Sequence, residues 1–188
     1  AHTVEVGGRR ITAANILIAT GGRAKRPSPA WITSDEAFHL PSLPKRIAVL
    51  GGGYIGVEFA HIFAGLGAKV TLIHRDKLVL RGFDPEVREL MTASLPAHGI
   101  DVVCCTEVGG KAGALIAGDR TIEVDLQMAA VGRDPNSHGL GLAEVGVTLD
   151  AKHAITVDEW SRTSVPHIYA VGDVTGRVAL TPVAIREG

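Results

Sequence analysis

The sequence has few cysteines, and this scarcity already removes some classes of protein. Only two, Cys104 and Cys105, occur among 188 residues, so no disulfide framework can hold the fold. A disulfide between adjacent residues would be strained. We therefore expect two reduced thiols in a strand, which weakly indicates a reducing, cytoplasmic location. The eight histidines show no metal-ligand spacing, so no metal site is predicted.

Long apolar runs and blocks of positive charge are also missing. No stretch approaches the roughly 20 apolar residues of a membrane-spanning helix, so we expect no membrane contact. Lys and Arg total 19 against 20 Asp and Glu, and without a basic block we expect no nucleic-acid partner. Aromatic residues make up only 4%, but 46% of the residues are hydrophobic, which is typical of a globular chain. The opening Ala1-His2-Thr3 has no initiator Met and no signal-peptide pattern, and we expect a longer parent chain.

A strand–helix–strand unit is predicted in the middle of the sequence. The segment 46–50 is a short continuous apolar run, typical of a parallel strand buried on both faces. Apolar residues then recur at helical spacing until Gly67, and 70–73 reads as the next strand. The pattern repeats with a strand at 100–105, after a helix that starts near Pro85 and is marked by Val87, Leu90, Met91 and Leu95.

The segments around this unit complete the expected fold. Gly-rich turns and β-like segments between 114 and 124 look like an antiparallel excursion before a last buried strand at 126–131. Alternating strands and helices imply an α/β fold with a parallel sheet and right-handed crossovers, a Rossmann-like NAD(P)-binding domain. Outside it we expect a hairpin at 3–12, strands at 16–20 and 168–171, and a helix with Thr181 as its cap and Pro182 as its first residue.

Three glycines between the first strand and its helix form a dinucleotide-binding fingerprint. Gly51 permits the tight turn, Gly53 lets the backbone approach a pyrophosphate, and Gly56 lets helix and strand pack closely. The helix N-terminus then offers free N–H groups to the phosphates. An ordinary Gly-rich turn is the alternative, but the strand before, the helix after and the second strand on schedule favour a coenzyme site.

The end of the second strand indicates which coenzyme binds. NAD sites place an acidic residue there, which accepts a hydrogen bond from the ribose 2′-hydroxyl. This sequence has His74 and Arg75 at that place, with Arg81 six residues further on. Guanidinium groups attract a 2′-phosphate, which an acid would repel. The residues therefore favour NADPH, and two solvated surface arginines are the alternative.

These motifs closely resemble the glutathione reductase branch of the FAD-dependent pyridine nucleotide-disulfide oxidoreductase family. The resemblance rests on Gly51–Glu58, on His74-Arg75 and on Leu80–Asp84, and it extends along nearly the whole chain. Further matching segments are Ala19–Gly22, Ile32–Asp35, Gly132–Asn136, Ile168–Val174 and Leu180–Ala184. The resemblance implies that residues 1–22 are the end of a first FAD-domain segment, 23–133 an NADPH-binding domain, and 134–188 the return into the FAD domain.

The resemblance also implies two sets of coenzyme contacts. For NADPH they would be Gly51, Gly52, Gly53, Tyr54, Ile55, Gly56, Glu58, His74, Arg75, Arg81, Gly132 and Ala179. For FAD they would be Thr20, Gly21, Asp173 and Thr181.

Four of these residues would have specific roles. Tyr54 would cover the flavin until nicotinamide displaces it, and Glu58 would pair with a lysine near the flavin. Asp173 would bond the ribityl chain, and Thr181 would sit at a helix end whose dipole stabilises reduced flavin. The alternatives are a packing aromatic for Tyr54, a solvated helix charge for Glu58 and a turn former for Asp173.

The departures from the family pattern set the functional expectation. The redox-active C-x-x-x-x-C, the first FAD glycine motif and the catalytic His and Glu of the dimerisation domain are absent from this sequence. Gly56 stands where NADPH-using members more usually have Ala. We expect the parent protein to be a homodimeric oxidoreductase that acts in redox homeostasis. It would pass electrons from NADPH through FAD and a cysteine pair to glutathione disulfide. We expect no catalytic residue in this chain. A relative with another disulfide substrate and an inactive nucleotide-binding module remain alternatives; lipoamide dehydrogenase would need an acid at position 74.

Overall fold

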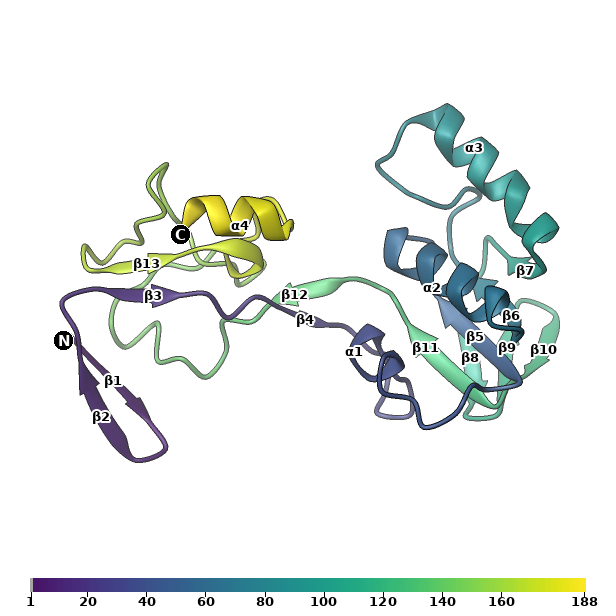
Figure 1. Ribbon diagram of the computed structural model, residues 1–188, viewed down its shortest axis with the longest axis horizontal. Helices are drawn as coiled ribbons and strands as arrows, with labels where there is room; N and C mark the ends of the chain where they lie inside the picture. The colour runs from purple at the N-terminus through teal and green to yellow at the C-terminus, as the bar shows by residue number, and fades with distance from the viewer. Residues whose placement is uncertain (1) are drawn as a thin grey trace. The chain divides into compact units, whose positions relative to one another are not determined.

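The computed structural model describes residues 2–188, which divide into two compact units (Figure 1). The central unit is Ala24–Gly132, and the flanking unit combines the chain up to Arg23 with Arg133–Gly188. The assignment of these units to NADPH and FAD binding stays a prediction. No helix within residues 2–188 is long and apolar enough to cross a membrane.

A four-stranded parallel sheet in the order β11-β5-β6-β7 forms the frame of the central unit. Helix α2 connects β5 to β6, and α3 with the 3₁₀ turn η1 connects β6 to β7 (Figure 1). The elements are β5 (Arg46–Leu50), α2 (Tyr54–Gly65), β6 (Lys69–Ile73), α3 (Pro85–Ser94), η1 (Leu95–His98), β7 (Ile100–Val103) and β11 (Leu126–Ala129). The predicted α/β fold with a parallel sheet is confirmed.

The predicted antiparallel excursion is a three-stranded sheet in the order β10-β9-β8. Its strands are β8 (Val108–Lys111), β9 (Ala114–Ala117) and β10 (Arg120–Glu123). Strand β8 was not predicted, because the paired glycines Gly109 and Gly110 give it little of the apolar alternation that indicates a strand.

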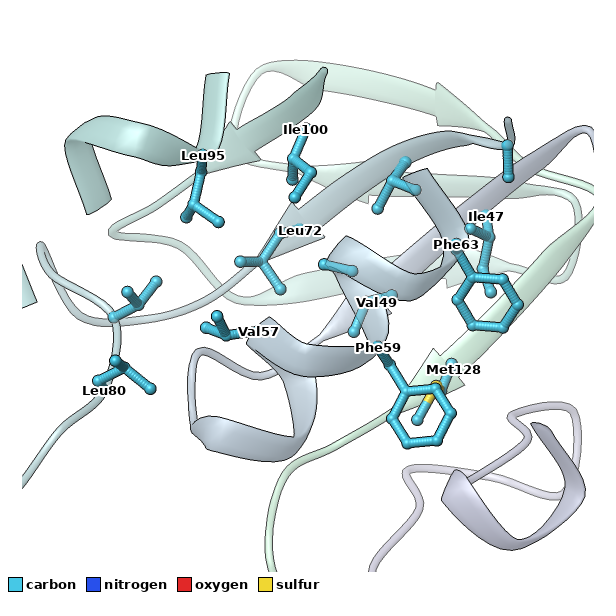
Figure 2. Close-up of a cluster of buried hydrophobic side chains, with 14 residues drawn as sticks. Ile47, Val49, Val57, Phe59, Phe63, Leu72, Leu80, Leu95, Ile100 and Met128 are labelled. Carbon is cyan, nitrogen blue, oxygen red and sulfur yellow. The ribbon is translucent and has the colours of Figure 1, made fainter. Parts of the chain in front are cut away.

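The parallel sheet is buried on both faces, as the continuous apolar run predicted. Alternate residues of β5 enter different clusters, with Ile47 and Val49 on one face and Ala48 and Leu50 on the other. The first cluster packs the sheet against α2, whose Phe59 and other apolar side chains lie over β5 and β6 (Figure 2). The second cluster packs the sheet against the antiparallel excursion through Leu115, Ile122 and Val124.

A capping box starts the short helix α1 (Ser34–Ala37) in the central unit. The Thr33 hydroxyl accepts from the Asp35 N–H, and the Glu36 carboxylate accepts from the Thr33 N–H at 2.8 Å. Arg26 bonds the other Glu36 oxygen at 2.7 Å. Hydrogen bonds from the hydroxyl and N–H of Thr33, with the Arg26 contact, lower the pKa of Glu36 to about 2. Ile32 meanwhile bridges to Met128, so the capping segment is anchored beside β11.

This lowered pKa predicts a pH-dependent contribution to stability. The depressed carboxyl stabilises the fold fully above its unfolded pKa of about 4.3, and this contribution is lost as the pH falls towards about 2. We expect Glu36→Gln to lower the free energy of unfolding at neutral pH and to lose less on acidification than the wild type. Urea titrations from pH 7 to 2.5 measure both, with exposed Glu89→Gln as control. Parallel pH curves for wild type and Glu36→Gln would contradict the expectation.

The flanking unit is built from short pieces. The hairpin of β1 (Thr3–Val6) and β2 (Arg9–Thr12) is confirmed, and β3 (Ile16–Ile18) pairs in parallel with β13 (Ile168–Ala170). Strand β4 (Gly22–Ala24) pairs with β12 (Arg133–Pro135). The 3₁₀ turn η2 (Gly172–Thr175) and helix α4 (Thr181–Glu187) close the chain. The core of the unit contains Ile18, Leu142, Val147, Ile155, Ile168, Ala170 and Val174.

Two local predictions are wrong. Strand β7 ends at Val103, so Cys104 and Cys105 do not lie in it, because Cys105 adopts a positive φ of 62° that an extended strand cannot contain. Thr181 does not cap α4: it is the first helical residue, and Leu180 precedes it without a side-chain cap. The helix predicted from Pro85 is confirmed as α3, but of its apolar residues Val87 and Leu90 are exposed, Leu90 by 72%, and Met91 packs partly against the core. Only Leu95, in the following turn, is fully buried.

Candidate functional site

The glycine turn lies at the carboxyl end of β5, where two of its glycines leave no room for a side chain. Gly51 has a φ of +121°, and a Cβ on it would lie 2.2 Å from the carbonyl oxygen of Ala130. A Cβ on Gly56 would lie 1.9 Å from the carbonyl oxygen of Gly51. The Gly51 N–H donates to the carbonyl of Ile73 at 2.8 Å, which ties the turn to the neighbouring strand. The turn therefore needs glycine at both positions for backbone reasons.

The middle of the turn is open. Gly53 is the N-cap of α2 and supplies no side-chain hydrogen bond to the first helical N–H groups. A Cβ on Gly53 would meet no atom within 4 Å. Exposed N–H groups and the positive end of a twelve-residue helix form a place where a phosphate can bind.

A hydrogen bond holds the 74–84 segment against the glycine turn. The Leu80 N–H donates to the Gly52 carbonyl at 2.6 Å, and Leu80 itself is buried at a φ of 55°. The next residue is Arg81. At the start of the segment, the His74 ring lies against Gly52: a Cβ on Gly52 would lie 3.1 Å from the imidazole Cγ. The structure thus brings the predicted phosphate turn and the predicted 2′-phosphate segment together.

Arg75 and Arg81 are both available for a ligand. Both are exposed, and neither guanidinium forms a hydrogen bond or ion pair with any residue in the range 2–188. By contrast, Arg88 in the same region bonds the carbonyls of Leu78 and Val79 and so supports the segment itself. Two unpaired guanidinium groups beside an open phosphate turn give the site a positive end.

His74 differs from these arginines because it is buried. Only 4% of the residue is exposed, and its Nε2 has no hydrogen-bond partner among the described residues. Burial lowers the pKa of His74, and nearby Asp76 opposes that shift in part. The imidazole is therefore neutral at neutral pH. A contribution of protonated His74 to phosphate binding is expected only below its ordinary pKa of about 6.5. The unsatisfied Nε2 is an atom that a bound ribose or phosphate can satisfy.

The structure gives less support for a coenzyme role of the other predicted NADPH residues. Tyr54 is half exposed and Glu58 is exposed, and neither has a partner within residues 2–188. Ile55 packs partly against the core. Gly132 ends the central unit with a φ of +114° and accepts a hydrogen bond from the Lys25 N–H. Ala179 belongs to the flanking unit, unlike the other predicted NADPH contacts. The gate and ion-pair roles stay predictions.

The predicted FAD residues gather in part within the flanking unit. The Thr20 hydroxyl donates to the Asn136 carbonyl at 2.7 Å, and the Asn136 N–H donates to the Gly21 carbonyl at 2.9 Å. Asp173 lies 4.0 Å from Nε of Arg133. This contact was missed from sequence, although Arg133 lies in a segment that carried the family resemblance. Thr181 is exposed at the start of α4 and has none of these contacts.

The described residues offer no alternative metal chemistry. Within 2–188 there is no group of three or more His, Cys, Asp or Glu side chains that could hold a metal ion.

Comparison with known proteins agrees with this geometry. The pyridine nucleotide-disulphide oxidoreductase family matches the sequence over residues 1–188. The chain belongs to this family. A glutathione reductase of Burkholderia cepacia is 53% identical over all of the chain and 44% of its own length. A trypanothione reductase of Trypanosoma congolense is 46% identical over 95% of the chain and 39% of its own length. The chain thus spans less than half the length of these curated relatives.

The fold of the family is matched as well. The HOCl-induced flavoprotein disulfide reductase RclA from Escherichia coli superposes with a TM-score of 0.90 at 29% sequence identity. The match covers 99% of this chain and 46% of that one.

Proposed function

We propose that the central unit binds NADPH. The observation that carries the proposal is the Leu80 N–H to Gly52 carbonyl bond, which holds the arginine segment beside the open phosphate turn. The first-turn N–H groups of α2 would bind the pyrophosphate, with Gly51, Gly52, Gly53, Ile55 and Gly56 forming its backbone cradle. Arg75 and Arg81 would bind the 2′-phosphate, and His74 Nε2 would meet the adjacent ribose. A titration comparing NADPH with NADH tests the proposal.

The whole protein would be a glutathione-disulfide reductase with FAD as its second coenzyme. When bound, NADPH would supply a hydride, and FAD would relay the electron pair to a cysteine pair and on to glutathione disulfide. Thr20, Gly21, Asp173 and Thr181 would hold the flavin, Tyr54 would cover it, and Glu58 would pair with a flavin-side lysine. The 53% identity to a glutathione reductase over the whole chain supports this substrate. We further propose that the whole protein is a cytoplasmic homodimer that acts in redox homeostasis.

A different disulfide substrate is the second candidate. A trypanothione reductase matches the chain at 46% identity, so both substrates are compatible with this part of the sequence. Nothing in the central unit separates them, because that unit would contact only the coenzyme. Activity of the complete protein with each disulfide decides between them.

The 188-residue chain by itself should reduce no disulfide. It contains no two cysteines with four residues between them, and its adjacent pair lies directly after β7 in the central unit. We expect NADPH oxidation in the presence of added FAD and glutathione disulfide to stay at the rate without protein. The glutathione reductase of Burkholderia cepacia serves as the positive control. Sustained turnover by the purified chain would disprove the expectation. Turnover that persists in the Cys104→Ser, Cys105→Ser double variant would show that electrons reach the disulfide without these thiols.

A further inference from the structure

Two thiols meet directly after β7, at a place that the proposed function does not use. Cys104 and Cys105 are both exposed and free, and the Cys105 thiol donates to Cys104 Sγ at 3.3 Å. In an extended strand, neighbouring side chains point to opposite faces. The φ of 62° at Cys105 departs from that geometry, and this left-handed conformation is unfavourable for a residue with a side chain. The turn after β7 therefore brings two exposed sulfurs to one side.

The ligand class follows from the number and softness of these groups. Thiolates select soft centres. A structural zinc ion needs four ligands, but no cluster of three or more His, Cys, Asp or Glu side chains exists among residues 2–188. A trivalent arsenic atom with one organic substituent needs only two sulfurs. The pair thus suits a two-thiol centre and not a four-ligand metal.

The dithiol is also linked to the proposed coenzyme segment. The His74 N–H donates to the Val103 carbonyl at 3.0 Å, and the Thr106 N–H points to the His74 carbonyl at 3.5 Å. The residues on both sides of the cysteine pair therefore hold the backbone of His74, which directly precedes Arg75. The hydrogen bond to the Cys104 sulfur raises the pKa of the Cys105 thiol, and the positive charge of Lys77 opposes that shift in part.

We propose that Cys104 and Cys105 form a chelating site for a mono-substituted trivalent arsenical, and that its occupation weakens NADPH binding. In the reaction with phenylarsine oxide, two S–H bonds and the arsenic–oxygen bond break and two S–As bonds form. Both protons leave with the oxygen as water, and arsenic stays trivalent. The chelate adds an arsenic atom and its organic substituent to the turn that holds the His74 backbone, and we expect this added bulk to shift the segment that leads to Arg75. This second effect rests on the proposed function.

The test uses phenylarsine oxide and the 188-residue chain, in which these are the only cysteines. Mass spectrometry should show one arsenical per chain, retained against excess 2-mercaptoethanol and released by 2,3-dimercaptopropanol. The variants Cys104→Ser and Cys105→Ser each keep one thiol and should lose the adduct to 2-mercaptoethanol. An adduct no more stable on the wild type than on either variant would overturn the chelating site. Circular dichroism checks that all three chains are folded.

Coenzyme titration tests the linkage separately. The Kd for NADPH should rise on the order of fivefold or more in the wild-type adduct, and should not change in variants treated identically. A stable adduct with unchanged Kd would overturn the linkage and leave the chelating site supported. If the untreated chain binds no NADPH, the proposed function fails and the linkage fails with it, while adduct retention still decides the chelating site.

Discussion

Replacing Arg75 and Arg81 together with alanine should remove most of the preference for NADPH over NADH. The glycine turn binds the pyrophosphate that both coenzymes share, so only the 2′-phosphate distinguishes them. Each charge-assisted hydrogen bond to it contributes about 1.5–3 kcal/mol, and exposure and salt screening favour the lower value. Two arginines then give a preference on the order of a hundredfold, at about 1.4 kcal/mol for each factor of ten. Calorimetric titration of both coenzymes against both chains measures the change.

The control for this variant removes the same charge elsewhere. Arg9→Ala with Arg10→Ala removes two exposed arginines of the β1–β2 hairpin in the flanking unit, neither of which has a partner within residues 2–188. This control should keep the wild-type ratio of the two Kd values. Equal affinities for NADPH and NADH in the wild type, or an unaltered ratio in the Arg75, Arg81 variant, would refute the assignment of these residues.

A single methyl group at position 56 should have the second large effect. In Gly56→Ala, the new Cβ would lie 1.9 Å from the Gly51 carbonyl oxygen, so the helix must move away from the turn. Overpacking of this kind costs about 1–3 kcal/mol or more. We expect a lower free energy of unfolding of the central unit and loss of NADPH binding, because α2 no longer presents its N-terminus to the turn.

The same helix supplies a matched control. A Cβ on Gly65 meets no atom within 4 Å, so Gly65→Ala should stabilise α2 by up to about 0.5–1 kcal/mol and leave coenzyme binding unchanged. Urea unfolding in a Trp160→Phe background isolates the fluorescence of buried Trp31, which reports on the central unit. If the Gly56→Ala variant has the same urea midpoint and the same Kd for NADPH as its Trp160→Phe background, the packing argument is wrong.

Features set by neighbouring residues were predictable from the sequence. The apolar run of β5, the helical spacing of α2 and the glycines between them are local patterns, and the structure confirms the strand–turn–helix that they predicted. Arg75 could be located for the same reason, because it lies two residues after the end of β6, a strand that the apolar pattern predicts. Its contact with NADPH remains a prediction that the titration tests.

What only the tertiary structure decided depends on segments distant in sequence. The hydrogen bond from the Leu80 N–H to the carbonyl of Gly52, 28 positions earlier, places Arg81 beside the glycine turn. Hydrophobic periodicity does not predict this contact. Burial of His74, with its unsatisfied Nε2, depends on how that loop folds over the turn. The positive φ that brings Cys104 and Cys105 together is likewise invisible in a sequence that reads there as a strand. The sequence alone determined the order of elements and the glycine turn, because hydrophobic periodicity and glycine act locally; burial, loop closure and strained backbone required the packed chain.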